Sequence, residues 1–321
     1  MSLETLLAAL ADGEFHSGDE LGGVLGVSRT AVWKQLKKVE ELGLPLNSIK
    51  GKGYCIEGGL DLLSAPVITE GIASDVSALI SHLDVRGVIA STNAVAMEKA
   101  VQGITGYICT AEQQTAGRGR RGRVWASPYA SNLYLSVVWE FGGGAASLEG
   151  LSLAVGVAVV DALEKSGLSG AELKWPNDVL YQGRKLAGVL LEMTGDPAGR
   201  CHVVIGIGLN VSMPASIYID QPWIDVRSIS EPAASRNQLL IAILNELMLL
   251  LSTFEGQGFS AYQERWQALD AFAGAEVAMS LANDTIVGKA VGVDTTGAIM
   301  IETSAGMCRF NGGEVSLRAT G

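Results

Sequence analysis

The sequence is poor in the residues that build zinc sites and disulfide frameworks. Its 321 residues include four cysteines and three histidines. No cysteine lies within three residues of another, and the three histidines form no ligand cluster. Structural zinc sites need closely spaced ligands, and small disulfide-rich domains need many cysteine pairs, so both classes are excluded. We expect free thiols and a cytoplasmic protein.

Positive charge and long apolar runs are also scarce. There are 23 Lys and Arg against 34 Asp and Glu, which gives a net charge of −11. This excess of acid excludes binding of nucleic acid over the whole surface, although a local basic patch is compatible with it. The longest uncharged stretch, residues 203–219, contains Asn, Ser and Pro. We therefore expect no membrane span, and the start of the chain lacks the basic segment of a signal peptide.

Residues 1–62 are predicted to form a winged helix-turn-helix domain. Leucines at helical spacing open the chain, Ser17 and Ser28 are candidate N-caps of two further helices, and residues 44–57 read as a hairpin. Residues 28–56 carry six Lys or Arg and two acids. This local excess favours DNA binding over an ordinary solvated helix with basic residues near its end. The candidate DNA contacts are Ser28, Arg29, Thr30, Trp33, Lys34, Lys37, Lys38, Lys50 and Lys52.

The rest of the chain predicts two further domains, so the fold class is α+β multidomain. Residues 63–272 alternate strand-like and helical segments and favour a mixed α/β sheet backed by helices on one side. Residues 273–321 contain short strands separated by turns about every ten residues, which is typical of a small, SH3-like five-stranded β-barrel. The 40 glycines are about twice the usual share and indicate many tight turns or backbone-lined loops.

The segment from Gly117 to Arg123 places four arginines next to glycines. Such a backbone can fold closely around an anion while guanidinium groups bind its oxygens. It matches neither a P-loop nor a dinucleotide fingerprint. An exposed loop that touches nucleic acid nonspecifically is the alternative. Its position between apolar strands, closed by Trp125, favours a folded anion site.

A second polar segment follows in the run Lys-Trp-Pro-Asn-Asp at residues 174–178. Pro176 ends a strand and exposes Asn177 and Asp178 as a polar elbow, which suits a hydrated Mg²⁺ or a phosphate. Lys185 then opens an apolar strand, where it can supply a fixed positive charge. An ordinary turn with surface charges is the alternative interpretation of this segment alone.

These segments resemble the biotin–protein ligases. The shared motifs are, in chain order, Ser91-Thr-Asn93, the Arg-Gly loop, Lys-Trp-Pro-Asn-Asp, Gly-Arg-Lys-Leu-Ala-Gly-Val-Leu-Leu-Glu, Ile205-Gly-Ile-Gly-Leu-Asn-Val and Gly312 to Arg318. With the helix-turn-helix, the chain resembles the bifunctional type that biotinylates a carboxylase subunit and represses biotin genes. The resemblance implies two steps: ATP activates biotin to biotinyl-5′-AMP, and a carrier lysine then takes the biotinyl group in an amide bond.

The resemblance also implies roles for individual residues. The catalytic group would comprise Lys185, Arg118 and Arg120. The biotin-binding group would comprise Ser91, Thr92, Asn93, Gln114, Arg118, Gly119, Arg120 and Lys185. The ATP- and adenylate-binding group would comprise Arg121, Asn177, Asp178, Asn210, Trp223 and Arg318. Asn177 and Asp178 would place Mg²⁺ with ATP, without a tightly bound metal. Trp223 could instead be a core anchor beside Ile224.

The implied partners are the biotin carboxyl carrier protein of acetyl-CoA carboxylase, operator DNA and a second copy of the chain in an adenylate-dependent homodimer. Trp33-Lys34-Gln35 on the third helix does not reveal the operator sequence. Two other functions stay open. A lipoate–protein ligase would use the same wider fold, and a ligand-responsive transcription factor would bind without catalysis; the Arg-Gly loop with Lys185 and the Asn177-Asp178 pair favours the biotin ligase.

Overall fold

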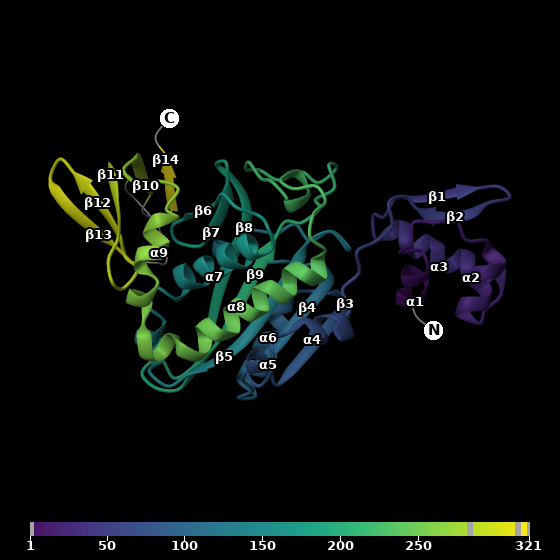
Figure 1. Cartoon of the computed structure of the whole chain (residues 1–321), viewed down its shortest axis with the longest axis horizontal. Helices are drawn as coiled ribbons and strands as arrows, with labels where there is room; N and C mark the ends of the chain where they lie inside the picture. Colours follow the sequence, from purple (N-terminus) through teal and green to yellow (C-terminus); the bar gives the residue numbers. More distant parts are fainter. Residues whose placement is uncertain (1–2, 281–284, 312–315, 320–321) are drawn as a thin grey trace.

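The computed structural model describes residues 3–280, 285–311 and 316–319, with side chains as far as residue 311. Three parts follow one another along the chain (Figure 1): a small helical module with a hairpin, a large central domain and a C-terminal sheet. This order is the predicted one.

The N-terminal module has the predicted winged helix-turn-helix fold. Ser17 caps the second helix in a reciprocal capping box with Glu20, and Ser28 caps the third helix. Gly26 ends the second helix with φ 63°, a conformation that favours glycine. The elements are α1 (Leu3–Ala9), α2 (Gly18–Leu25), α3 (Arg29–Glu41), β1 (Leu46–Ile49) and β2 (Gly53–Ile56), the last two forming the antiparallel wing.

Seven of the described strands form the central sheet in the order β3-β4-β5-β9-β8-β7-β6. The β3–β4 pair is parallel and every other neighbouring pair is antiparallel, so the sheet is mixed as predicted. The strands are β3 (His82–Ile89), β4 (Tyr107–Gln114), β5 (Leu133–Phe141), β6 (Ala171–Lys174), β7 (Asp178–Tyr181), β8 (Arg184–Gly195) and β9 (Cys201–Leu209).

Helices cover both faces of this sheet, and the expectation of helices on one side was wrong. One face carries α4 (Ala65–Gly71), α5 (Ser74–Ser77), α7 (Leu151–Lys165), α8 (Arg236–Gln257) and α9 (Gln263–Ala268) around the main core. The other face carries α6 (Thr92–Val101), whose Ala96 and Ala100 pack on Cys109 and Val138. The reason is the parallel β3–β4 pair, since its connection must cross over the sheet. The described residues also form the short 3-10 turns η1 (Arg120–Gly122), η2 (Gly144–Leu148), η3 (Val226–Ser228) and η4 (Phe259–Ala261).

Two helical stretches, Gly144–Lys165 and Arg236–Gln257, are long and apolar enough to cross a membrane by length and composition. Their most apolar windows are 61% and 50% buried within the protein. Both stretches contribute to the main core through residues such as Val155, Val159 and Leu247. Burial in a core explains their apolar character.

The C-terminal part is an antiparallel sheet in the order β13-β12-β11-β10-β14 across its described strands. Trp175 of the central domain is buried, and its indole N–H donates to the carbonyl of Gly297 at 3.0 Å. This contact fixes the C-terminal sheet beside the Lys-Trp-Pro-Asn-Asp segment. The strands are β10 (Glu276–Ser280), β11 (Thr285–Val293), β12 (Ile299–Thr303), β13 (Gly306–Phe310) and β14 (Ser316–Ala319).

Candidate functional site

A cavity of about 760 Å³ lies in the central domain between the Arg-Gly loop, the start of α6, and strands β8 and β9. Its wall brings together residues from segments far apart in the sequence. The predicted site residues that line it are Ser91, Thr92, Asn93, Gln114, Arg118, Gly119, Arg120, Arg121, Asn177, Asp178 and Lys185.

One wall of the cavity is neutral and hydrogen-bonded. The Gln114 carbonyl oxygen accepts from the Thr92 backbone N–H at 2.8 Å and from its hydroxyl at 3.1 Å. The Gln114 amide donates to the Ser127 hydroxyl at 3.1 Å. The Ser136 hydroxyl contacts Thr92 Oγ1 at 2.8 Å and Asn93 Oδ1 at 2.5 Å. These bonds fix the polar groups in place before any ligand binds.

Glycines in β9 allow this wall to lie directly on the sheet. A Cβ atom at Gly206 would stand 2.3 Å from Asn93 Oδ1, and one at Gly208 would stand 2.4 Å from the Trp125 ring. A side chain at either position would therefore displace Asn93 or Trp125. The Gly-Ile-Gly motif of β9 is the sequence signature of this close approach.

The Arg-Gly loop folds back on itself at the cavity mouth. The Gly119 backbone N–H donates to the Arg123 carbonyl at 2.7 Å. Arg118 Nη2 lies 3.1 Å from Glu192 Oε2, the same oxygen that accepts from the Asn93 amide at 2.7 Å. The loop is thus joined to β8 and, through Glu192, to the neutral wall.

The cationic end of the cavity is formed by Arg120 and Lys185. Arg120 Nη1 donates to Asn177 Oδ1 at 3.1 Å. Burial lowers the pKa of Arg120, and the Asp178 carboxylate opposes that change. Lys185 Nζ lies 2.7 Å from Asp178 Oδ1 and 5.4 Å from the centre of the Trp125 ring. Because burial costs a cation its hydration, an anionic ligand at this end would be favoured.

The donor atoms of Asn177 and Asp178 suit a metal bound together with phosphate. Mg²⁺ in nucleotide sites takes one or two carboxylates plus phosphate and water oxygens. Asp178 supplies a carboxylate at the cavity, and Asn177 supplies an amide oxygen. The part of the chain that the structure describes holds no group of three or more His, Cys, Asp or Glu arranged for a metal. The residues fit a metal that arrives with its nucleotide.

Three predicted ATP-site residues are placed differently. Asn210 is buried, and its amide donates to the carbonyls of Lys185 and Ile224, each at 3.2 Å. Neither Asn210 nor the half-buried Trp223 is among the described residues that line the cavity, although Pro222 is. Arg318 pairs with Ala278 in the β10–β14 ladder, and its side chain lies outside the described side chains.

Sequence reasoning missed several residues of the site. Ser136 is a lone hydroxyl in an apolar strand, Ser127 follows the Arg-Gly loop, and Glu192 ends a motif that was recognised without a role for it. Trp125 was assigned only to closing the loop, yet its ring covers β9. A buried polar residue in an apolar strand was the available signal, because such a group must find a partner.

The predicted DNA contacts all lie on the exposed surface of the N-terminal module. Trp33 on α3 is 49% exposed, and Lys37 Nζ lies 4.1 Å from the centre of its ring. Lys34 and Lys38 are exposed on the same helix, and Lys50 and Lys52 are exposed at the wing. One helix and one hairpin tip therefore present the basic groups together.

Sequence profiles of three families match the chain. Residues 87–210 match the biotin/lipoate A/B protein ligase family, residues 2–55 match an HTH domain, and residues 272–318 match the biotin protein ligase C-terminal domain. The three matches follow the three parts of the fold.

Curated relatives and solved structures agree with the profiles. The chain is 38% identical to the bifunctional ligase/repressor BirA of Salmonella typhimurium, covering 98% of this chain and 97% of that one. It is 30% identical to BirA of Bacillus subtilis over 97% of this chain and 96% of that one. Among solved structures, the biotin protein ligase of Aquifex aeolicus in complex with biotin and ATP has a TM-score of 0.66 and 30% identity, covering 75% of this chain and all (100%) of that one.

Proposed function

The chain belongs to the biotin protein ligase family, and we propose on that basis that it is a bifunctional ligase and repressor. It joins biotin to a lysine of the biotin carboxyl carrier protein of acetyl-CoA carboxylase. The observation that carries the proposal is the division of one cavity into a neutral hydrogen-bonding wall and a cationic end. Biotin has a neutral ureido ring and a carboxylate, and ATP adds a triphosphate, so the two ends match the two substrates.

The reaction consists of two substitutions. A biotin carboxylate oxygen attacks the α-phosphorus of ATP, the bond to the bridging oxygen of the β-phosphate breaks, and pyrophosphate leaves. The neutral amine of the carrier lysine then attacks the acyl carbon of biotinyl-5′-AMP, the acyl C–O bond breaks, AMP leaves, and the nitrogen releases a proton to water as the amide forms. Neither step requires a nucleophile from the enzyme, because positioning and charge neutralisation supply the catalysis.

The neutral wall would bind the ureido ring, which offers two N–H donors and a carbonyl acceptor. Ser91, Thr92, Asn93 and Gln114 are the groups proposed for it. The side chains of Thr92, Asn93 and Gln114 are already oriented by hydrogen bonds. Preorganised polar groups favour a ligand such as the ureido ring, which can replace those hydrogen bonds, over the apolar ring of lipoate, which cannot.

The cationic end would bind the reacting carboxylate and α-phosphate. Lys185 is placed there by its ion pair with Asp178, and its charge would counter the negative charge that develops on the phosphate oxygens. Arg118, Gly119 and Arg120 would cover the adenylate, with Arg121 beside its phosphate. These interactions would strengthen as negative charge develops on the phosphate oxygens. The loop would also keep water away from the mixed anhydride.

The rest of the nucleotide would extend toward the elbow after β6. Asn177 and Asp178 would hold Mg²⁺, which neutralises the triphosphate when bound. Asn210 would act through the backbone it holds, because its amide bonds the carbonyl of Lys185. Trp223 would cover adenine, and Arg318 would contact the triphosphate from the C-terminal domain. The domains proposed for these tasks are residues 1–62, 63–272 and 273–321.

The repressor function belongs to the N-terminal module. Its exposed basic groups on α3 and the wing suit phosphate contacts at an operator. Biotinyl-5′-AMP would act as corepressor by favouring a homodimer that places two modules on two half-sites. Both ATP-dependent ligation and operator binding take place in the cytoplasm, which is the location we propose.

Two measurements on the purified chain test this function. Pyrophosphate release from ATP should depend on biotin, and a carrier domain should gain the mass of a biotinyl group. No biotin-dependent release would support a non-catalytic transcription factor. A lipoyl mass on a carrier offered both vitamins would support a lipoate ligase.

A further inference from the structure

One aromatic residue of the central domain is part of the hydrophobic core of the N-terminal module. Tyr129 follows the Arg-Gly loop in sequence, yet it is 4% exposed within the cluster formed by Leu6, Leu10, Val32 and other module residues. Ala130 packs against the same cluster. The module core is therefore completed by a side chain from the ligase domain.

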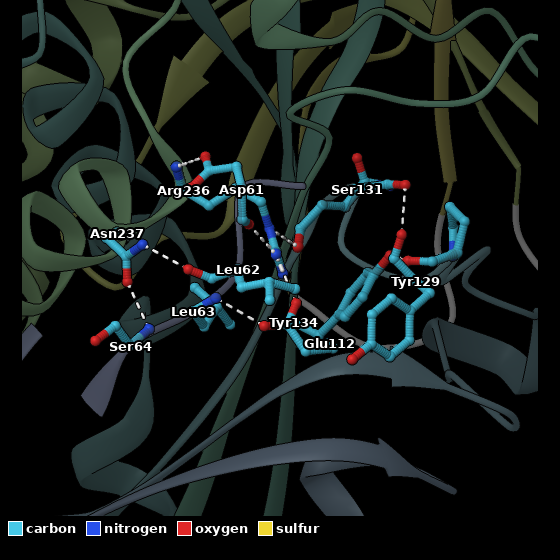
Figure 2. Close-up of polar contacts among 12 residues, drawn as sticks. Asp61, Leu62, Leu63, Ser64, Glu112, Tyr129, Ser131, Tyr134, Arg236 and Asn237 are labelled. Atoms are coloured by element: carbon cyan, nitrogen blue, oxygen red, sulfur yellow. Dashed lines mark hydrogen bonds and ion pairs between the residues drawn. The ribbon is translucent and has the colours of Figure 1, made fainter. Parts of the chain in front are cut away.

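The chain that joins the two domains is fixed by a buried ion pair (Figure 2). Arg236 is 1% exposed, and its Nη1 donates to Glu112 Oε2 at 2.6 Å and to the carbonyl of Asp61 at 2.7 Å. The other Glu112 oxygen accepts from the Leu63 backbone N–H at 2.7 Å. Arg236 Nε also donates to the carbonyl of Asn132 at 3.0 Å, just beyond Tyr129. One buried pair thus holds both the linker and the end of the Tyr129 segment.

Asn237 adds a second attachment to the linker. Its carbonyl oxygen accepts from the Ser64 backbone N–H, and its amide donates to the Leu62 carbonyl, both at 2.8 Å (Figure 2). A flexible linker would leave these backbone groups to water. Residues 61–64 are instead bonded to the start of α8 and to β4, so the module has a defined orientation.

The segment that carries Tyr129 begins at the cavity. Trp125 lines the cavity, and Ser127 accepts the hydrogen bond from Gln114 of the neutral wall. Tyr134 also lines the cavity, and its hydroxyl donates to the Pro128 carbonyl at 2.7 Å. The chain therefore passes from the ligand cavity to the module core within a few residues.

We propose that Tyr129 is a positioning residue for DNA recognition. Its segment begins at the wall of the ligand cavity, and its ring in the module core fixes the orientation of the winged module. The inference rests on the repressor function proposed above. A dimer must place two recognition helices about 34 Å apart to read successive major grooves, so a module free to rotate would bind two half-sites poorly. A single half-site imposes no such requirement. Because the same segment lines the cavity, ligand binding there biases the orientation of the module.

The test compares full-length Tyr129→Ala, Tyr129→Phe and Asn237→Ala with the wild type. The probe is a duplex that the wild type selects from random DNA with biotin and ATP present, prepared with both half-sites or with one. Tyr129→Ala should bind the two-site duplex at least tenfold more weakly and the single site within twofold of wild type. Tyr129→Phe, which keeps the ring, should bind both like the wild type. Biotin-dependent pyrophosphate release should stay within twofold in every variant.

Asn237→Ala keeps the inference testable if loss of the ring unfolds the module, because this residue lies outside the module core. It should show the same selective loss on the two-site duplex. In the wild type, biotin with ATP should tighten DNA binding. In Tyr129→Ala the ratio of DNA affinities with and without biotin and ATP should fall toward one. Equal losses on both duplexes by both alanine variants would overturn the inference, as would unchanged two-site binding. If the wild type itself selects no duplex, the repressor function fails instead, whatever the variants do.

Discussion

Lys185 combines a charge with two fixed neighbours, the carboxylate of Asp178 and the ring of Trp125. The side chain is 17% exposed, so water screens its charge less than that of a surface lysine. Its carbonyl is held by the buried Asn210 amide, and its backbone N–H donates to Pro222 at 3.0 Å. Backbone and side chain are both restrained, which is the arrangement needed for a charge that must act at one place.

Lys185→Ala should leave the protein folded and lower the rate of biotin-dependent pyrophosphate release by about 10²–10³-fold. This corresponds to about 3 kcal/mol, the usual effect of removing one preorganised electrostatic donor. Pyrophosphate release at saturating biotin and ATP measures it. The control is Lys165→Ala on α7, since that lysine pairs with Glu246, is exposed and does not line the cavity. Equal rates of pyrophosphate release in the two variants would contradict a catalytic role for Lys185.

Arg118→Gly should release the adenylate early. The substitution removes the contact with Glu192 that joins the Arg-Gly loop to β8. A freed acyl-adenylate reacts with any exposed lysine, so added bystander proteins should become biotinylated by the variant. Streptavidin blots of the bystander measure the effect, with Arg200→Gly as control because Arg200 lies on an exposed turn. Adenylate formation without bystander labelling would contradict the role given to Arg118.

At the scale of elements, the close fit between β9 and the neutral wall sets a limit on substitution. Gly206→Ala places a methyl group 2.3 Å from Asn93 Oδ1, which must then move. We expect the KM for biotin to rise roughly fivefold, because displacing Asn93 removes about one hydrogen bond worth about 1 kcal/mol. Steady-state kinetics measure it, and Gly256→Ala at the end of α8 is the control, since a methyl group there meets open space. An unchanged KM would show that Asn93 does not bind biotin.

The C-terminal sheet carries a pH-dependent contact. Partial burial raises the pKa of Asp294, but the Arg309 guanidinium and the donors of Thr296 and Ala298 outweigh it and hold the value at about 2. The folded pKa is thus below its ordinary value of 3.8, so the contribution to stability is present above about pH 4 and is lost as pH falls through about 2. The difference in Tm between wild type and Asp294→Asn should therefore shrink between pH 5 and pH 2. A constant difference would contradict this assignment.

Element prediction from sequence succeeded where local chemistry decides. Ser17 and Ser28 were identified as caps because a serine before a helical run satisfies free N–H groups, and both cap the expected helices. Strand β3 and helix α6 lack such a local signal. Their residues, such as Asp84, Arg86 and Asn93, break the usual periodicity because parallel pairing and cavity contacts, which act at long range, determine them.

At the scale of the whole molecule, charge is distributed unevenly between the module and the rest of the chain. The chain carries a net charge of −11, yet the basic groups of α3 and the wing are exposed together. Lys34→Ala should weaken operator binding and lower the slope of log affinity against log salt by about 1, because one phosphate contact is lost. Ligation should be unaffected. A salt series of DNA-binding measurements tests this, and an unchanged slope would remove Lys34 from the interface.

The order of the three domains and eleven of the residues that line the cavity were predicted from the sequence, because motifs at fixed spacing carry both. It could not predict the junction between the domains. Tyr129 lies in a loop in the local sequence, and Arg236 stands at the start of a helix. Their roles depend on partners far away in the sequence, which are the module core for Tyr129 and Glu112 for Arg236. No local pattern encodes such a pair.

The place of Tyr129 in the module core also has a consequence for biosynthesis. Domains generally fold in turn from the N-terminus as the chain is made. The helices and wing of the module end at Ile56, so they leave the ribosome well before Tyr129 does. The nascent module therefore lacks one aromatic ring of its core until the ligase domain supplies Tyr129. A ribosome stalled between these points would display an incomplete repressor, and full DNA-binding competence would arise only after synthesis has passed into the ligase domain.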